Sequence, residues 1–470
     1  MRSNVLTTPQ HATQQKPSFD SLLTDLHWEF NDTRKALLER RKESQHALNQ
    51  GMLPNFIPQK LRHHKEHRPA PFRRYRSQLV LESSKLAQFD KAASSQADSI
   101  KLVFENHQAC EARTHREIAD LLAHYRGEQA ILFSPRGLSK TSQKSYRAEP
   151  GSASLYDIAS YMYAASEQSR DVHLVVSKLE NHLEARFIAE VVAFCEGKLG
   201  LEVGSSRVSL VVDHILASFE LESIILEFGG RLSSIDSDSY AFAYSVLKCF
   251  QKQHSLTLAV ADKALKEQGF MQNYQKHILH LAHKYPVAAM SDAALHLQLS
   301  GFNQGQQQLA QEQCRMDASQ GFDGCQCHER LLLPTVNAAF ERRDYTRQAP
   351  APVRKRDLLP EFDSAFEVSF IQEDDIRQRV ASCLSYLDEL QHQRFELRPE
   401  HFHYYRAQLW TWMRKALMLE NGTQISDGLY RRIRDEEILK RSSATIEQSA
   451  EILDRLLISE RFKEDVSFAN

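Results

Sequence analysis

The sequence predicts an α/β fold, a (β/α)8 TIM barrel with an N-terminal helical clasp and a C-terminal all-helical plug domain. Between residues 98 and 340, short β-branched or aliphatic runs alternate with amphipathic helices, which is typical of βα units with parallel strands. Seven visible strands and a plausible eighth, spread over about 250 residues, suit a closed barrel better than an open doubly wound sheet. After Asp374 the pattern is helical throughout.

The barrel, predicted for residues 77–345, has strands expected at seven places. They are Ile100–Phe104, Ala130–Phe133, Val172–Val176, Val208–Val212, Ala241–Val246, Leu256–Val260 and Val287–Met290. Helices are predicted between them, among others at Leu183–Cys195, Ile215–Phe228 and Met271–Lys284. In this fold the active face lies at the C-terminal ends of the strands.

The N-terminal part is predicted as a flexible tail (residues 1–17) and a clasp with a basic linker (residues 18–76). Ser18 can cap a first helix with apolar positions from Phe19 to Phe30, and a second helix should end at Gly51. A linker rich in proline and arginine is predicted at residues 346–365, before a helical domain at residues 366–470. Its expected helices are Ile376–Leu390, Tyr404–Leu419 and Ser443–Arg461.

Composition narrows the class of protein. The chain has 59 Lys and Arg residues and 61 Asp and Glu residues. Its net charge is therefore too small to attract the whole protein to nucleic acid or to a membrane surface. The chain has no apolar run of about 18 residues and no apolar stretch near its polar N-terminus, so we expect a cytoplasmic protein. Seven scattered cysteines indicate reduced thiols rather than a disulfide framework.

Five segments, collinear along the chain, carry a family resemblance. They are Ser21–Pro58, Val175–Arg186 (VVSKLENHLEAR), Ser209–Phe228, Arg406–Trp412 (RAQLWTW) and Ala450–Phe462. Together they resemble the shorter, A-type malate synthases. The resemblance implies Mg²⁺-dependent condensation of acetyl-CoA with glyoxylate, with a carboxylate base on the C-terminal domain and an arginine that stabilises the enolate. A thioester methyl group is a very weak acid, so this chemistry needs both the base and the cationic groups.

The position of the family's catalytic arginine is changed in this chain. In the matching stretch, residues 133–139, Ser134 stands where the resemblance places that arginine. Arg136, two residues later, is a candidate catalytic replacement that could reach across from its loop. The alternative is an ordinary arginine on a surface loop. Glu105 is what remains of an acidic family motif and is expected to face the barrel mouth.

The metal ligands implied by the resemblance are also altered. Asp213 replaces a metal-binding glutamate and keeps the carboxylate on a shorter side chain. The second ligand position falls on Ala241, which cannot bind a metal. Asp236 or Asp238 could supply a carboxylate instead, so a rebuilt pair of Asp213 and Asp238 is a candidate Mg²⁺ site, the alternative being a solvated acidic loop. No other cofactor is predicted.

The catalytic base is replaced by a residue of opposite charge. Arg398 occupies the base position in an ungapped alignment, and a guanidinium cannot abstract a proton. A small shift in register would bring Glu396 or Glu400 there instead.

Three further patterns have less specific interpretations. Cys325, Cys327 and His328 could form a soft-metal cluster, but their spacing is tighter than in zinc sites, and reduced loop cysteines are the alternative. The histidines at 63, 64 and 67 could bind a metal through helical spacing, but they lie in a basic linker. That basic segment, 62–76, could meet phosphates or RNA, or pair with the barrel's acidic rim. Trp410 and Trp412 are expected to be packing anchors.

The resemblance and these replacements lead to one preferred hypothesis. The chain is a malate-synthase-like pseudoenzyme that binds a small molecule in the barrel mouth, or a protein partner, with no role in binding nucleic acid or a membrane. The alternatives are an enzyme with a repurposed pocket for another acyl-CoA, keto acid or small molecule, and residual malate synthase activity.

Overall fold

The computed structural model describes residues 16–57, 76–82, 87–105, 111–147, 149–253, 265, 268–294, 304–341, 350–360, 371–392 and 398–463. Its barrel strands are β1 (Ser77–Glu82), β2 (Ser99–Val103), β3 (Ala130–Ser134), β6 (His173–Val176), β7 (Arg207–Val212), β8 (Leu232–Ser237), β9 (Ala288–Ala294) and β10 (Gly324–Cys327). These strands are parallel and close in the order β1-β10-β9-β8-β7-β6-β3-β2. The predicted (β/α)8 barrel is therefore confirmed.

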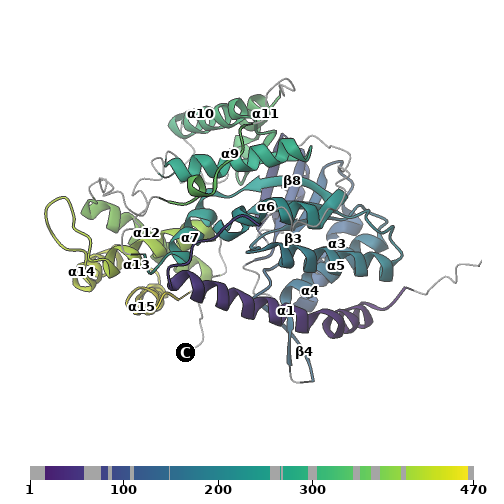
Figure 1. The fold of residues 1–470 in the computed structure, drawn as a ribbon, viewed down its shortest axis with the longest axis horizontal. Coiled ribbons are helices and arrows are strands. Elements are labelled where there is room, and N and C mark those ends of the chain that lie inside the picture. Colours follow the sequence, from purple (N-terminus) through teal and green to yellow (C-terminus); the bar gives the residue numbers. More distant parts are fainter. Residues whose placement is uncertain are drawn as a thin grey trace, which may run out of the picture.

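Helices surround the strands, and consecutive helices from α3 to α7 pack on one another, as do α10 and α11 (Figure 1). They are α2 (Phe89–Ala93), α3 (Glu111–His124), α4 (Ala153–Glu167), α5 (His182–Leu199), α6 (Ile215–Phe228), α7 (Ser239–Cys249), α9 (Gly269–Lys284), α10 (Gln304–Gln320) and α11 (Leu333–Ala339). An antiparallel hairpin of β4 (Thr141–Tyr146) and β5 (Glu149–Ser152) projects beside the barrel.

The N-terminal segment forms one helix, α1 (Phe19–Asn49), instead of the two that the sequence predicted. The predicted cap is confirmed, because the Ser18 side chain accepts a hydrogen bond from the Ser21 N–H at 3.2 Å. Residues 31–36 contain neither glycine nor proline, so nothing interrupts the helix between its two apolar stretches. α1 runs along α4 and α5 (Figure 1), with Leu22 and Leu26 buried.

One predicted strand is wrong. Residues Ala241–Val246 lie in α7, and the strand of this unit is β8, just before it. The Asp238 carboxylate starts the helix by accepting a hydrogen bond from the Ala241 N–H at 3.0 Å. β8 was missed because most of its residues are serine or aspartate, whereas α7 is buried on several sides and looks uniformly apolar. The predicted strand Leu256–Val260 lies outside the described residues.

The C-terminal part contains α12 (Glu373–Gln391), α13 (Pro399–Arg414), α14 (Asp427–Leu439) and α15 (Ile446–Leu457). α13 packs against α7, so this helical unit lies over the barrel mouth (Figure 1). Trp412 is buried, and the Trp410 indole donates to the Ser459 carbonyl at 2.9 Å, as expected of packing anchors.

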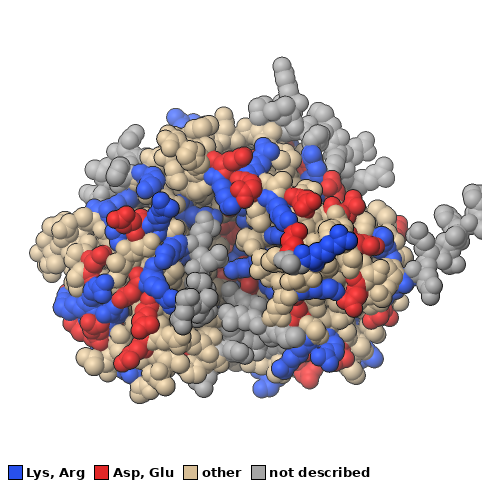
Figure 2. Space-filling view, turned by 90° about the horizontal axis from the view of Figure 1, so that it is seen from below, with Lys and Arg blue, Asp and Glu red and all other residues tan. Residues whose placement is uncertain are grey.

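The outer surface reflects the balanced charge of the sequence. On the face shown in Figure 2, basic and acidic side chains are interspersed rather than gathered by sign. Among the described helices, none has both the length and the apolar character needed to cross a membrane.

Candidate functional site

A cavity of about 190 Å³ opens at the C-terminal ends of the strands, under the start of α13. Ser134 lies at the end of β3, Asp213 directly after β7 and Asp238 directly after β8, so the fold itself gathers these side chains. The charged residues of its wall are Arg41, Lys101, Glu105, Lys140, Lys178, Glu180, Asp213, Asp238, Lys248, Arg398 and Glu400.

Glu105 faces this cavity, in line with the sequence-based expectation, and its carboxylate is already engaged. It accepts a hydrogen bond from the Gly137 N–H at 2.7 Å and lies 3.2 Å from the Lys178 ammonium. Burial opposes the charge on Lys178, but Glu105 and Asp213 raise the pKa of Lys178 above its ordinary value. Lys178 is therefore a fixed positive charge on the wall.

Asp213 is held by the backbone of the same lysine. Both of its oxygens accept from the Lys178 N–H, each at 2.9 Å. Burial raises the pKa of Asp213 to about 7; the Lys178 charge opposes this rise and the Asp238 charge adds to it. At neutral pH the Asp213 carboxyl is thus divided between its acid and its anion.

The predicted magnesium pair, Asp213 and Asp238, lies on the same cavity wall, but the arrangement does not fit the ion. Mg²⁺ prefers hard oxygen ligands in octahedral geometry, usually one or two carboxylates together with waters. Both Asp213 oxygens are engaged by the Lys178 N–H, one Asp238 oxygen caps α7, and Ala241 lines the cavity without an oxygen ligand. In the described part of the chain, no three His, Cys, Asp or Glu side chains are grouped as metal ligands.

Arg136 lies outside the cavity, so the structure supports neither its catalytic placement nor the surface-loop alternative. The guanidinium is buried between α3 and α4. It donates to the two Asp157 oxygens at 2.9 and 2.7 Å and to Glu111 at 2.8 Å. These carboxylates point the side chain away from the barrel mouth, where Ser134 is left on the cavity wall.

Arg398 stands at the N-terminus of α13 and faces the cavity. Its Nε donates to the Glu400 carboxylate at 3.0 Å, and its Nη1 contacts the His328 ring. Glu400, one of the two alternative bases, also lines the cavity and is paired with this arginine. Glu396, the other alternative, lies outside the described residues.

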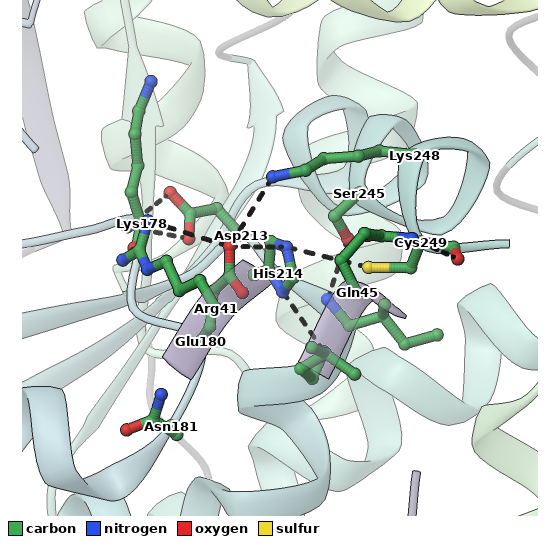
Figure 3. Close-up of polar contacts among 12 residues, drawn as sticks. Arg41, Gln45, Lys178, Glu180, Asn181, Asp213, His214, Ser245, Lys248 and Cys249 are labelled. Carbon is green, nitrogen blue, oxygen red and sulfur yellow. Dashed lines mark hydrogen bonds and ion pairs between the residues drawn. The ribbon is translucent and has the colours of Figure 1, made fainter. Parts of the chain in front are cut away.

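Sequence analysis missed a second cluster of charges, centred on Glu180 (Figure 3). The Glu180 carboxylate lies 3.7 Å from Arg41, 3.5 Å from His214 and 3.5 Å from Lys248. Burial lowers the pKa of His214 to about 4, so its ring is neutral at pH 7. The sequence signals for this cluster were the adjacency of His214 to Asp213 and the presence of Arg41 and Glu180 in the segments that carry the family resemblance.

Lys101 was missed as well. It lies in the middle of the apolar strand β2, and its ammonium nitrogen donates to the Gln326 side-chain oxygen at 2.9 Å. A charged residue inside an otherwise apolar strand was the available signal, because such a position faces either solvent or the barrel interior.

The cysteines of β10 are buried thiols. The Cys325 thiol contacts the Gln326 carbonyl and the Cys327 thiol contacts the Glu329 carbonyl, both at 3.2 Å, and burial raises the pKa of Cys327. The His328 ring contacts the Val80 carbonyl instead of joining them. The three histidines at 63, 64 and 67 lie outside the described residues.

Two malate synthase domain models and several malate synthases match this chain. Residues 130–360 match the model of the malate synthase TIM barrel domain, and residues 17–61 match that of the malate synthase N-terminal domain. The glyoxysomal malate synthase of Candida tropicalis is 22% identical over 89% of this chain and 85% of its own length. The malate synthase of Dictyostelium discoideum is 24% identical over 94% of this chain and 91% of its own. A solved structure of protein CitE from Mycobacterium tuberculosis matches 58% of this chain and 92% of its own with a TM-score of 0.40 and 15% identity.

Proposed function

The chain belongs to the malate synthase family, and we propose that it has lost the Mg²⁺-dependent condensation of acetyl-CoA with glyoxylate and uses its barrel mouth to bind a small anionic ligand. The observation that supports this proposal is the positively charged side chain of Arg398, at the start of α13 in the C-terminal helical domain. Arg398 lies on the cavity wall at the position where the family resemblance places the base. A guanidinium stays protonated and cannot remove a methyl proton.

Two carboxylates of the cavity wall are poor substitutes for the base, because each is already paired with a cation. Glu400 forms an ion pair with Arg398, and Glu105 with Lys178. Either group would have to leave its partner before it could take a proton.

The two groups that the family resemblance assigns to enolate stabilisation, an arginine and Mg²⁺, are also altered at this wall. Ser134 offers a hydroxyl in place of a guanidinium, and the site around Asp213 and Asp238 does not fit Mg²⁺. Loss of one such electrostatic group typically lowers the rate by about 10² to 10³. The losses of base, arginine and metal site therefore leave little of the original chemistry.

The wall of the mouth carries six basic and five acidic side chains, so basic side chains are slightly in excess. Among the basic ones, Lys178 and Arg398 are charged at neutral pH, and Asp213 is partly neutral near pH 7. A carboxylate-bearing molecule would gain charge-assisted hydrogen bonds there. We therefore assign the cavity to small organic acids.

The test uses the full-length protein. Acetyl-CoA, glyoxylate and Mg²⁺ are supplied, and release of free thiol is followed, with Escherichia coli malate synthase A assayed in parallel as a positive control. We expect no release above the spontaneous rate, together with calorimetric binding of glyoxylate or pyruvate. Thiol release at the rate of the control enzyme would overturn the loss of condensation, and absence of binding would overturn the ligand assignment.

A second candidate function is an enzyme with a repurposed pocket, and one observation favours it. The pKa of Asp213, at about 7, suits general acid–base catalysis at neutral pH. A cavity with such a group could act on another keto acid or acyl-CoA. Screening of small organic acids for turnover that depends on Asp213, lost in Asp213→Asn, would separate this candidate from simple binding.

A further inference from the structure

Lys101 has an unusual position for a lysine, because it is buried in the middle of a barrel strand. It occupies the third of five positions in β2, between Ile100 and Leu102, and its side chain reaches the cavity. The strand neighbours in register are Val80 and Leu132, so the flanking barrel wall is apolar. Only 7% of the residue is exposed to solvent. A lysine at such a position is costly to keep as an ammonium unless a partner balances its charge.

The direct partner of Lys101 is neutral. Its Nζ donates to the Gln326 Oε1 at 2.9 Å, and the Gln326 Nε2 donates to the Ser237 carbonyl at 3.0 Å. The second hydrogen bond fixes the amide, so its oxygen faces the amine. Among the described residues, no carboxylate lies within ion-pair distance of this nitrogen. Lys178, in the same cavity, differs because it is paired with Glu105 at 3.2 Å.

More distant charges act on Lys101 from every side of the mouth. Asp236 in β8, Asp238 before α7 and Glu400 in α13 favour the ammonium, whereas Arg398 opposes it. Burial is the largest influence, and it lowers the pKa of Lys101 below the ordinary value for lysine. A buried amine with a lowered pKa keeps a larger neutral, nucleophilic fraction near pH 7 than a lysine on the surface.

We propose that Lys101 forms an imine with the carbonyl carbon of a small 2-oxo acid or aldehyde bound in the barrel mouth. This inference rests on the proposed ligand class, because the carbonyl compound must first bind in the cavity. Lys178 and Arg398 line the same space and supply positive charge for the carboxylate of a 2-oxo acid. The resulting activity differs from the condensation of acetyl-CoA, since it needs neither a metal ion nor an enolate of a thioester.

The step balances without an oxidant or reductant. The lone pair of the Lys101 nitrogen forms the new C–N bond while the carbonyl π electrons move to oxygen. The nitrogen loses both of its protons in turn, and both end on the departing oxygen, which leaves as water. The amine and the carbonyl compound thus give one imine and one water molecule. In such an intermediate the nitrogen withdraws electrons from the adjacent carbon.

Reductive trapping tests the imine. The full-length protein is incubated with pyruvate or glyoxylate and then treated with borohydride, which reduces an imine to a stable secondary amine. Intact mass and peptide mapping should show one adduct per chain, located on Lys101. We expect Lys178, whose ammonium is paired with Glu105, to stay unmodified in the same sample. Lys101→Met and Lys101→Arg should abolish the adduct, and Lys198→Met, at a lysine of α5 paired with Asp25 outside the cavity, should leave it unchanged.

Calorimetry on the same preparations separates the outcomes. Binding of pyruvate or glyoxylate without an adduct on Lys101 would overturn the imine and leave the proposed ligand class standing. An adduct spread over surface lysines, or one that persists in both Lys101 variants, would also overturn it. Absence of binding would remove the proposed ligand class and the imine together. The peptide map of the protein without substitutions shows whether Lys101 carries the adduct, even if a Lys101 variant fails to fold.

Discussion

The Arg398 guanidinium lies 3.0 Å from the Glu400 carboxylate at the mouth of the barrel. The pair places a cation and an occupied carboxylate where condensation would require a base. It also joins the start of α13 to the cavity, because both side chains lie on the cavity wall. The arginine therefore connects the two parts of the proposed function, the loss of condensation and the binding of a small organic acid.

Arg398→Ala should weaken binding of pyruvate or glyoxylate by about 1.5–3 kcal/mol, the typical contribution of a hydrogen bond to a charged group. Isothermal calorimetry measures the change. Arg432→Ala is the matched control, because Arg432 pairs with Glu373 and Glu436 on the exposed side of α14. Equal affinities for the parent chain, Arg398→Ala and Arg432→Ala would argue against a role for Arg398 in ligand binding.

Arg398→Asp should not restore condensation. It returns a carboxylate to the base position but leaves Ser134 in place of the arginine and leaves the metal site unfit. Thiol release from acetyl-CoA in the presence of glyoxylate and Mg²⁺ should stay at the spontaneous rate. Substantial turnover by this variant would mean that the base was the only missing group.

Asp213 should make stability depend on pH. Its pKa is about 7 in the folded chain, against an ordinary value of 3.8 for an aspartate. The folded state thus binds more protons than the unfolded state between these values, so the free energy of unfolding falls as pH rises from about 4 to about 7. The full shift corresponds to about 4 kcal/mol. Urea unfolding at pH 5 and pH 8 should show a smaller decrease for Asp213→Asn than for the parent chain, and parallel decreases would contradict the assignment.

Arg136→Met should destabilise the fold without affecting the ligand. The change leaves Asp157 and Glu111 buried without their cation, which typically costs about 3–5 kcal/mol. Chemical denaturation measures the loss. Arg113→Met, at an exposed pair with Glu117 on α3, should cost no more than about 1 kcal/mol. A folded Arg136→Met protein that bound pyruvate as weakly as Arg398→Ala would place Arg136 in the site after all.

Arg41→Ala should loosen α1 from the barrel. Arg41 donates to both oxygens of the buried Glu184, at 2.7 and 2.8 Å, and to the Lys178 carbonyl at 2.7 Å. Its removal should lower stability by about 3 kcal/mol and speed amide hydrogen exchange along α1. Lys42→Ala is the control, since Lys42 is exposed and pairs with Glu39. Unchanged exchange in Arg41→Ala would show that apolar packing alone holds the helix.

The sequence predicted those parts of the fold whose signal is local. Strands β2, β3, β6, β7 and β9 contain apolar runs and were located to within a few residues, and α6 was predicted with its observed bounds. β8 was missed because serine and aspartate fill its inward and outward positions. A polar strand of this kind can be recognised only when its neighbours in the barrel are known.

The sequence predicted individual residues of the site but not the contacts that bring them together. Glu105, Asp213, Asp238 and Arg398 all line one cavity, although they lie far apart in the chain. Arg136 was placed wrongly because Asp157 and Glu111, which draw it away, are contributed by other elements. Contacts across the barrel, such as that between Lys101 and Gln326, join strands that are distant in sequence and leave no local pattern.

Exchange of the acetyl-CoA methyl protons with deuterium tests the central claim most directly, because it reports proton abstraction without requiring the rest of the condensation. The full-length protein is incubated with acetyl-CoA, Mg²⁺ and pyruvate in D₂O, and the methyl signal is followed by proton NMR. With Arg398 at the base position, we predict loss of signal no faster than in buffer alone. Exchange clearly faster than in buffer would show that a working base remains and would contradict the account.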